Sequence, residues 1–359
     1  MTRELQSLYG VRPLEDSGQT PCVRVLVAEA EGSAPREAGA AMRVWAGGFD
    51  GTIGGGTLEH QAIAHASALC AQTGLSVWHR ELRTYPLGPA LGQCCGGMVR
   101  LLFEVLPGLQ LPSQGQAAGA AGTSVSGGLI VRPLTSGTPP VIAHDRTFTA
   151  DWPLPVLHAV RQMLAGNRLR TTLLVAGRRG EPAWLIEPEA RAPHTLFLYG
   201  AGHVGRAVVR ALQDLPFAIT WIDTAADRFP AAMPQNATPV IEPNPARLAA
   251  VAPAGALHLV MTFSHALDLA IIGAVLAGDF AWAGLIGSAT KRARFEKRLR
   301  QSGVREWPIG RLQCPIGIGG ITGKEPAMIA ISVAAQLATW ASSDETGRRT
   351  ADAATEGGS

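Results

Sequence analysis

Two adjacent cysteines lie in a glycine-rich stretch of the chain, Gly92-Gln93-Cys94-Cys95-Gly96-Gly97. Glycines add no side-chain bulk, so this stretch predicts an exposed turn that a large group can approach closely. The spacing is not that of a zinc site. The structural alternative is one buried and one incidental cysteine, because free cysteines often belong to the core. Cys314, in a loop before Pro315, is a second candidate thiol, whereas Cys22 and Cys70 lie in regular elements and are expected in the core.

A second candidate site is the segment Gly200-Ala201-Gly202-His203-Val204-Gly205, which follows an apolar strand and opens a helix. This spacing predicts a tight turn whose backbone approaches a phosphate at the helix N-terminus. Asp223 ends the next strand, where an acidic side chain can hold ribose hydroxyls. The pattern indicates a dinucleotide-binding fold, but such folds also retain the loop for packing or for another ligand.

A third candidate site is basic. Ser288 is expected to cap a helix whose first turns carry Lys291, Arg292 and Arg294. Cations oppose the dipole at a helix N-terminus, so an anionic ligand would account for them. A solvated basic face is the alternative. Lys324 follows a glycine run that resembles a P-loop, but Ile318 and Glu325 stand where that motif needs Gly and Ser or Thr. Lys324 could still meet an anion.

Three further loops carry candidate groups. His265 follows a strand at the edge where open α/β sheets bind ligands, and it could act as an acid or base or cap its neighbours. Arg36 follows Pro35 in a turn and could clamp an oxyanion, or it could simply be a surface guanidinium. Gly54, Gly55 and Gly56 open a helix and offer a backbone-built loop.

The elements that must position these groups form two modules. Residues 1–192 read as short strands and glycine loops with two helices, and residues 107–128, which hold no charged side chain, read as a flexible insertion. Residues 193–341 alternate strands with helices, which predicts a parallel sheet covered on both faces. Residues 342–359 are expected to form a disordered polar tail. The predicted class is α/β, with a Rossmann-like C-terminal domain.

Composition limits the classes of function. Of the 359 residues, 47% are apolar and 16% are charged, which excludes global disorder. A net charge of +3 argues against nucleic acid or an anionic membrane as the main partner. No signal peptide or membrane span is evident. Five cysteines without a framework spacing fit a reducing cytoplasm.

Taken together and in order, the motifs resemble the xanthine dehydrogenase accessory protein family (XdhC/CoxI). The resemblance runs from about residue 22 to residue 338. It is carried by the segments 32–36, 51–56, 92–97, 200–205, 264–268, 284–288, 291–292 and 314–317. Two positions depart from the family: Phe263 stands where His is common, and Met328 stands where wider relatives often have Glu, so neither is assigned a role.

The resemblance implies an N-terminal XdhC/CoxI module and a cytoplasmic, non-catalytic protein, typically a homodimer. Such a protein binds molybdenum cofactor (molybdopterin), protects it while a cysteine desulfurase supplies the sulfido ligand, and delivers it to the xanthine dehydrogenase apoenzyme. A soft thiolate at Cys94 or Cys95 would suit the molybdenum. The candidate cofactor-binding residues are Arg36, Gly54, Gly55, Gly56, Cys94, Cys95, Gly200, Gly202, Gly205, Asp223, His265, Ser288, Lys291, Arg292, Cys314 and Lys324.

Two other classes of function stay open at this point. The glycine loop at residues 200–205 and Asp223 would also suit an NAD(P)-dependent oxidoreductase, although no Lys and Tyr pairing stands out near the loop. A nucleotide-sensing Rossmann module is the third class. Cofactor analysis separates them, because each predicts a different bound group: a pterin with molybdenum, NAD(H), or nothing.

Overall fold

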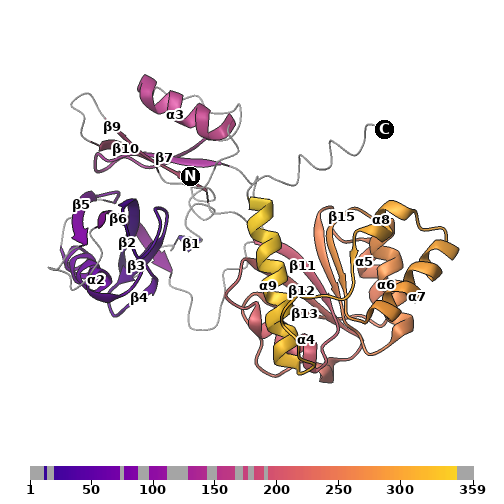
Figure 1. The fold of residues 1–359 in the computed structure, drawn as a ribbon. Coiled ribbons are helices and arrows are strands. Elements are labelled where there is room, and N and C mark those ends of the chain that lie inside the picture. The colour runs from indigo at the N-terminus through magenta and orange to yellow at the C-terminus, as the bar shows by residue number, and fades with distance from the viewer. Residues whose placement is uncertain are drawn as a thin grey trace. The chain divides into compact units, whose positions relative to one another are not determined.

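The computed structural model describes residues 12–13, 20–72, 77–87, 97–110, 128–143, 152–165, 173–176, 182–189 and 193–345. These residues belong to two compact units, the first ending before residue 192 and the second beginning there. The mixed α/β class expected from the sequence is confirmed, with antiparallel sheets in the first unit and a parallel sheet in the second (Figure 1).

The first unit contains a six-stranded antiparallel sheet. Its strands are β1 (Arg12–Pro13), β2 (Thr20–Glu31), β3 (Ala41–Trp45), β4 (Gly48–Gly51), β5 (Arg80–Leu87) and β6 (Gly97–Gln110). Strand β6 pairs with β2 along one edge and with β5 and β1 along the other. The expected insertion at residues 107–128 is therefore wrong for residues 107–110, which continue β6 because their backbone pairs with neighbouring strands. Residues 111–127 lie outside the described residues.

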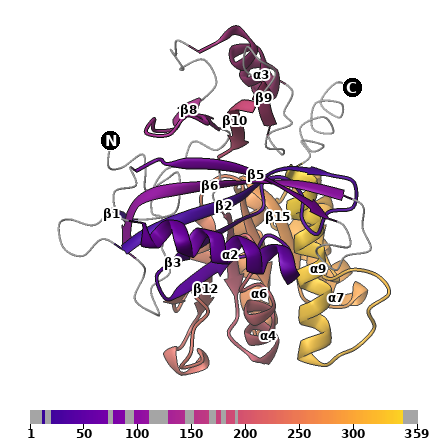
Figure 2. The ribbon, with the colours of Figure 1, turned by 90° about the vertical axis from the view of Figure 1, so that its left-hand side faces the viewer.

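Helix α2 (Gly56–Ala71) covers one face of this sheet (Figure 2). Its buried residues, Leu58, Ala62, Ala66 and Leu69, recur every three or four positions and so share one side of the helix. They pack on Val23, Val25 and Val27, which alternate along β2 and therefore all point to the same face. The buried side chains of helix and strand therefore form one shared core.

A second sheet in the same unit pairs its strands in the order β8-β7-β10-β9 and carries helix α3 (Leu154–Ala165). Its strands are β7 (Leu129–Pro133), β8 (Val141–Ala143), β9 (Leu173–Ala176) and β10 (Pro182–Pro188). Leu185 of β10 packs on Leu26 and Leu102 of the first sheet. The two sheets therefore share an apolar contact as well as the ionic contact described next.

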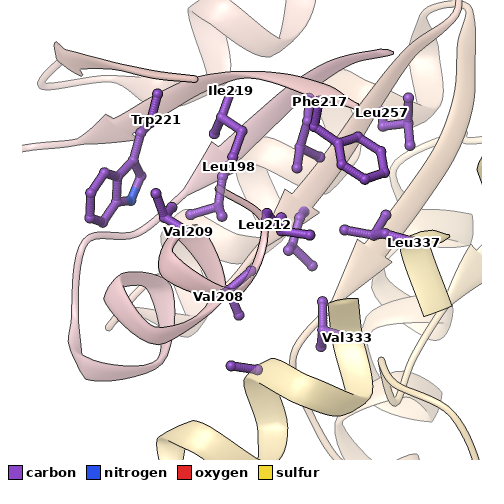
Figure 3. Packing of buried hydrophobic residues seen from close by; sticks show 14 of the residues in the cluster. Leu198, Val208, Val209, Leu212, Phe217, Ile219, Trp221, Leu257, Val333 and Leu337 are labelled. Carbon is purple, nitrogen blue, oxygen red and sulfur yellow. The ribbon is translucent and has the colours of Figure 1, made fainter. Parts of the chain in front are cut away.

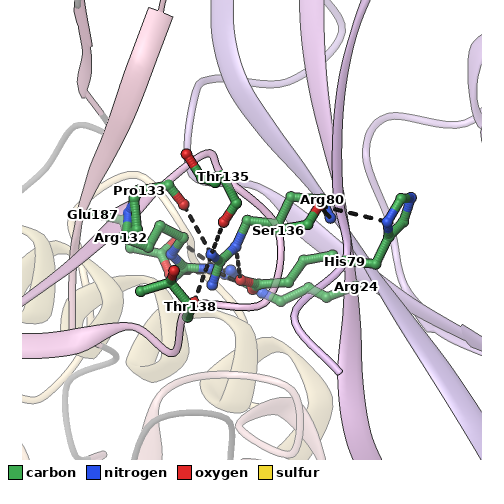
Figure 4. Close-up of polar contacts among 10 residues, drawn as sticks. Arg24, His79, Arg80, Arg132, Pro133, Thr135, Ser136, Thr138 and Glu187 are labelled. Atoms are coloured by element: carbon green, nitrogen blue, oxygen red, sulfur yellow. Dashed lines mark hydrogen bonds and ion pairs between the residues drawn. The ribbon is translucent and has the colours of Figure 1, made fainter. Parts of the chain in front are cut away.

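A buried ionic network joins the two sheets (Figure 4). Glu104 accepts from Arg80 Nε and from Arg132 Nη1, each at 2.6 Å. Arg132 also donates to Glu187, which pairs with Arg24 at 3.0 and 3.1 Å. Burial opposes the charge on Glu187, but the two guanidiniums outweigh burial and lower the pKa of this carboxyl. Breaking one such buried pair is costly, because the remaining charge stays in the interior.

The second unit is built on a parallel sheet in the order β13-β12-β11-β14-β15-β16. Counted along the unit, this order is 3-2-1-4-5-6, which is typical of Rossmann sheets. The strands are β11 (His194–Tyr199), β12 (Phe217–Asp223), β13 (Ala237–Ile241), β14 (Ala256–Val260), β15 (Phe280–Leu285) and β16 (Leu312–Gln313). The Rossmann-like C-terminal domain expected from the sequence is confirmed.

Helices cover both faces of this sheet. Helices α4 (His203–Ala211) and α9 (Pro326–Glu345) pack on one face, where Val208, Leu212 and Val333 meet Leu198 and Phe217 (Figure 3). The other face is covered by α5 (Pro245–Ala250), α6 (His265–Ala277), α7 (Ala289–Gln301) and α8 (Glu306–Gly310). A short 3₁₀ turn, η2 (Ala226–Arg228), follows β12. Continuous apolar strands are expected in a sheet that is buried on both faces.

Helix α9 is longer than expected and corrects the predicted tail. It runs to Glu345, so residues 342–345 are helical instead of disordered. Within this last turn, Ser343 Oγ donates to the carbonyl of Thr339 at 2.9 Å. Residues 346–359 lie outside the described residues. Within the described part of the chain, no helix is both long enough and apolar enough to cross a membrane.

A buried tyrosine–histidine pair lies in the second unit between the sheet and its helices. The hydroxyl of Tyr199 and Nδ1 of His258 are 3.1 Å apart, and the ring of His258 stacks beside those of Phe197 and Tyr199, with ring centres 5.5 and 6.0 Å away. His258 is 1% exposed. Burial disfavours the imidazolium and lowers the pKa of His258 to about 4, from an ordinary value of 6.5.

This pKa shift predicts acid sensitivity. Between pH 6.5 and about 4 the unfolded chain binds a proton at His258 that the folded chain does not. Stability is therefore full above pH 6.5 and falls towards pH 4, by roughly 3 kcal/mol from this residue. Urea unfolding at a series of pH values measures the slope. The variant H258Q should flatten it, whereas the exposed control H203A should keep it; an unchanged slope in H258Q would contradict the assignment.

Candidate functional site

Loops of the first unit meet at one end of its large sheet. A Cβ added to Gly54 would lie 2.6 Å from Pro35 Cβ and 3.2 Å from Arg36 Cγ, so these two loops touch. Gly54 has a φ of +120°, and Gly55 and Gly56 also have positive φ, which favours glycine at all three positions. Around Gly55 and Gly56 an added Cβ would meet nothing within 4 Å. The exposed Arg36 thus lies beside a glycine loop with open space at its surface.

A carboxylate that the sequence analysis missed holds this glycine loop. Glu59 Oε2 accepts from Thr52 Oγ1 at 2.5 Å, from the Ile53 amide at 2.9 Å and from the Gly55 amide at 3.1 Å. Burial raises the pKa of Glu59, but these hydrogen bonds outweigh burial and lower it overall. The amides of Ile53 and Gly55 therefore already have an anionic partner within the chain. A ligand would approach the loop at Gly56 and Arg36 instead.

The cysteine pair itself, Cys94 and Cys95, lies outside the described residues. The chain on either side of it is described: Leu87 pairs with Gly97 where β5 and β6 meet. A Cβ on Gly97 would come within 2.6 Å of the Glu31 carbonyl and 2.7 Å of the Ser33 carbonyl. Close packing therefore requires glycine at position 97. It anchors the end of the cysteine-bearing connection beside the loop that carries Arg36.

In the second unit, the glycine loop after β11 lies at the carboxyl edge of the sheet. An added Cβ on Gly200 would clash with the Met261 carbonyl, and one on Gly205 would clash with the Gly200 carbonyl. Packing within the fold therefore accounts for both glycines. Gly202 differs, because its added Cβ would meet nothing within 4 Å. It precedes α4 at the sheet edge where Rossmann folds bind phosphate, so the loop has the position expected from the sequence.

Asp223 is engaged within the chain. It is 5% exposed, and its Oδ2 accepts from the Ala201 amide while its Oδ1 accepts from the Thr224 amide, both at 2.6 Å. Arg228 lies 3.2 Å from the same carboxylate. These contacts tie the glycine loop to the end of β12. A ribose contact at Asp223 stays a prediction that must compete with these bonds.

Lys291 is not the exposed cation that the sequence suggests. Its Nζ donates to Asp268 Oδ2 at 2.6 Å and to the Ile286 carbonyl at 2.8 Å, and its side chain is 12% exposed. Asp268 is fully buried, and its Oδ1 accepts from the amide and hydroxyl of Thr262. Lys291 therefore neutralises a buried carboxylate, and this pairing explains a cation near a helix N-terminus without any ligand.

The neighbours of Lys291 are also engaged. Ser288 caps α7 through the Lys291 amide, as expected. Arg292 donates to Glu296 at 2.7 Å and to the Cys314 carbonyl at 3.2 Å. Cys314 is 1% exposed, and burial raises the pKa of its thiol although Lys291 and Arg292 lie near. The candidate thiol of Cys314 is therefore buried in this structure, and its contact with a cofactor stays a prediction.

The remaining candidates lie on the surface. His265 is exposed at the start of α6 and makes an edge contact with Phe295. Lys324 is exposed just before α9. An aromatic–cation pair was missed: Phe263 is 68% exposed, and the Arg228 guanidinium lies 4.1 Å from its ring centre. Asp268 was missed as the partner of Lys291. The sequence hint for Asp268 was its position four residues after Ser264, in the first turn of α6.

Comparison with known proteins assigns both units. The family model described as the XdhC and CoxI family matches residues 17–85, and the model of the XdhC Rossmann domain matches residues 196–337. The chain belongs to the XdhC family. The two matches follow one another in the order that the two units have along this XdhC chain.

Two known proteins are similar to this XdhC chain, one in sequence and one in fold. It is 30% identical over 143 residues to the uncharacterized protein YqeB of Escherichia coli K12, a match that covers 40% of this chain and about a quarter (26%) of YqeB. A solved protein of Bacillus halodurans, described as a xanthine dehydrogenase, matches with a TM-score of 0.65. That match covers 95% of this chain and 96% of the other at 19% identity, and so shows a shared fold.

The ion pair of Lys291 with Asp268 predicts that replacing Lys291 lowers stability far more than replacing Lys297 on the same helix. Replacing Lys291 by Ala leaves Asp268 charged and buried, which should lower the free energy of unfolding by about 3–5 kcal/mol. The matched control K297A removes an exposed lysine from the same helix and should change stability little. Urea unfolding followed by circular dichroism measures both. Equal stability of K291A and K297A would show that Lys291 is a solvated surface cation after all.

Proposed function

We propose that this protein is a molybdenum cofactor-binding chaperone that protects the cofactor during sulfuration and supports its insertion into xanthine dehydrogenase. The observation that carries the proposal is the match of both units to the two XdhC family models, in order. In this proposal the protein is an accessory factor in the cytoplasm, it acts as a homodimer, and it has no catalytic residue of its own. Its partners are the xanthine dehydrogenase apoenzyme and a cysteine desulfurase.

The first unit supplies groups that suit such a cofactor. Molybdopterin combines an anionic phosphate, a flat pterin and a dithiolene that holds molybdenum. Arg36 is an exposed cation, and the open space at Gly55 and Gly56 leaves room for a flat group beside it. Gly97, which follows Cys95 by two residues in the sequence, lies beside Ser33, and the proposal assigns a thiolate of Cys94 or Cys95 to the cofactor. A soft thiolate is a suitable ligand for molybdenum.

The basic groups of the second unit support the proposal less than the sequence suggests. Lys291 and Arg292 are bound to Asp268 and Glu296, so a cofactor phosphate would have to displace these carboxylates. Gly202 is the position that stays open. The alternative of an NAD(P)-dependent oxidoreductase uses this loop, but Asp223 is engaged with Ala201 and Thr224. We therefore place the cofactor contacts of the proposal in the first unit.

Cofactor analysis tests the proposed function. Protein purified from a cell that makes molybdenum cofactor should carry a fluorescent pterin and molybdenum in equal amounts. A strain that lacks the gene should make and fold its molybdenum hydroxylase, but that enzyme should lack active cofactor. Bound NAD(H) without a pterin would favour the oxidoreductase. A deletion strain with fully loaded, active hydroxylases would refute the chaperone function.

The cysteines allow a sharper experiment. Adjacent residues of an extended segment point in opposite directions, so one of Cys94 and Cys95 should face the cofactor and the other should not. The variants C94S and C95S should therefore differ: one should lose much of its bound or sulfurated cofactor, and the other should load like the parent. The measurement is the molybdenum and pterin content per chain, with the sulfido ligand determined as cyanide-labile sulfur.

Two other cysteines serve as controls. Cys22 is fully buried, and burial raises its pKa to about 12, while Cys70 is half-buried and its pKa is also raised. The variants C22S and C70S should lower the free energy of unfolding without changing cofactor content per folded chain. If C94S and C95S both load and sulfurate cofactor like the parent, the pair has no role in cofactor handling.

A further inference from the structure

An apolar groove runs along helix α6 on the surface of the second unit. It encloses about 670 Å³ between α6 and the segment that links α7 to α8. These helices lie side by side on one face of the sheet (Figure 1). Leu269 and Val304 present apolar surface in it, the buried Leu276, Leu299 and Pro308 lie beneath, and the small residues Ala266, Ala270, Gly273 and Ala277 leave its floor shallow. None of the candidate cofactor residues lines this groove.

The dimensions of the groove suit a helix. Its lining residues on α6 extend from Ala266 to Ala277, which at 1.5 Å per residue is a length of about 16 Å, or three turns. Helix-in-groove recognition places an amphipathic helix with apolar side chains at positions i, i+3, i+4 and i+7 into an apolar groove. The exposed Ala266, Ala270 and Ala277 allow the backbone of such a helix to approach α6 closely.

One rim of the groove is strongly basic. Helix α7 carries six cations and one acid. Arg294, Arg298 and Ser302 follow one another at four-residue spacing, so they share one side of the helix axis, and Ser302 lines the groove. Arg305 lines it directly. All three arginines are exposed, and none makes an ion pair with a carboxylate among the described residues.

The acids beside this rim do not neutralise it. Glu296 binds Arg292 at 2.7 Å and Arg300 at 3.5 Å, and Glu306 binds Arg300 at 2.5 Å. These salt bridges leave Arg305, which lines the groove, and Arg298 and Arg294, one and two turns before Ser302, as a cluster of cations without a carboxylate partner among the described residues. We call this surface, groove and cluster together, the α6–α7 face. Exposed like charges repel one another, so the cluster gains most when an oppositely charged surface covers it.

We propose that the α6–α7 face binds an acidic amphipathic helix of a partner protein. The leucines of that helix would occupy the groove, and its carboxylates would meet Arg294, Arg298 and Arg305. A second copy of this chain fits poorly, because no helix among the described residues carries more than two acids. Nucleic acid would use the cations but has no use for the apolar groove. The proposal stands whether or not the chain binds molybdenum cofactor.

A designed peptide tests the proposal on the full chain. The probe is a fluorescein-labelled helical peptide of about 14 residues, with Leu at i, i+3, i+4 and i+7 and Glu at most other positions. Its control is a scrambled peptide of the same composition, in which the leucines no longer share one face. Fluorescence anisotropy should show binding of the amphipathic peptide at least about tenfold tighter than that of the scrambled peptide, and weakening with salt.

Three variants locate the binding surface. A270Q fills the groove from an exposed position on α6, and R294E/R298E reverses the rim; each should weaken binding of the peptide by about tenfold or more. The control K297E makes one such charge reversal on the same helix, half the charge change of R294E/R298E, but Lys297 lies on the side away from Ser302, so its affinity should stay within about threefold of the parent. Circular dichroism checks that all variants are folded.

Several outcomes would overturn the proposal. Equal affinity for the scrambled peptide, or equal weakening by K297E and R294E/R298E, would show only nonspecific attraction of anions. Tight binding of a single-stranded RNA that ignores A270Q would assign the rim to nucleic acid. A parent protein that sediments as a dimer and becomes a monomer in A270Q would show that a second copy covers the groove.

Discussion

Three of the loops that carry candidate groups are each held by a buried or half-buried carboxylate. Glu59 binds the amides of the Gly54 loop, Asp223 binds the Ala201 amide of the Rossmann loop, and Asp268 binds the amide of Thr262. A glycine-rich loop has high conformational entropy when unfolded, and a carboxylate that accepts one or two backbone bonds offsets part of that cost. The same bonds decide which backbone amides stay open to a ligand.

Within each glycine motif, some glycines are required by packing inside the fold and others face open space that a ligand could occupy. In the Rossmann loop, Gly200 and Gly205 are required because any Cβ would collide with a neighbouring carbonyl, whereas Gly202 faces open space. In the first unit, Gly54 packs on Pro35, whereas Gly55 and Gly56 are open at the surface. Glycines that look equivalent in the motif therefore have different physical roles. The positions open to a ligand are those that packing does not explain.

The cations also divide into two groups, those that pair with carboxylates within the fold and those that are exposed without such a partner among the described residues. Arg80 and Arg132 are buried, Arg24 and Lys291 are partly buried, and together they neutralise Glu104, Glu187 and Asp268 at the contact between the sheets or at the start of a helix. Arg294, Arg298 and Arg305 are exposed beside an apolar groove. A chain with a small net charge can therefore still have a local basic surface, because many of its other cations are paired with carboxylates. Function is to be sought among the cations without a carboxylate partner.

The sequence alone determined the fold class and the family. Strand–loop–helix alternation after residue 193 and the Gly200 to Gly205 spacing predict a parallel Rossmann sheet, because hydrophobic periodicity and glycine requirements are local properties of the chain. It also determined the helix cap at Ser288, which depends only on residues three positions apart. The resemblance to the XdhC/CoxI family rested on short ordered motifs, and the family models match both units.

Only the tertiary structure decided which charged groups are paired. Lys291 and Asp268 are 23 residues apart, and Arg24 and Glu187 are 163 apart, so no local pattern identifies either pair. Burial of Cys314 and His258 likewise depends on neighbours from other elements. The groove beside α6 forms because the link between α7 and α8 folds against it. Burial and pairing are properties of groups that meet in space, and a pattern along the chain does not specify them.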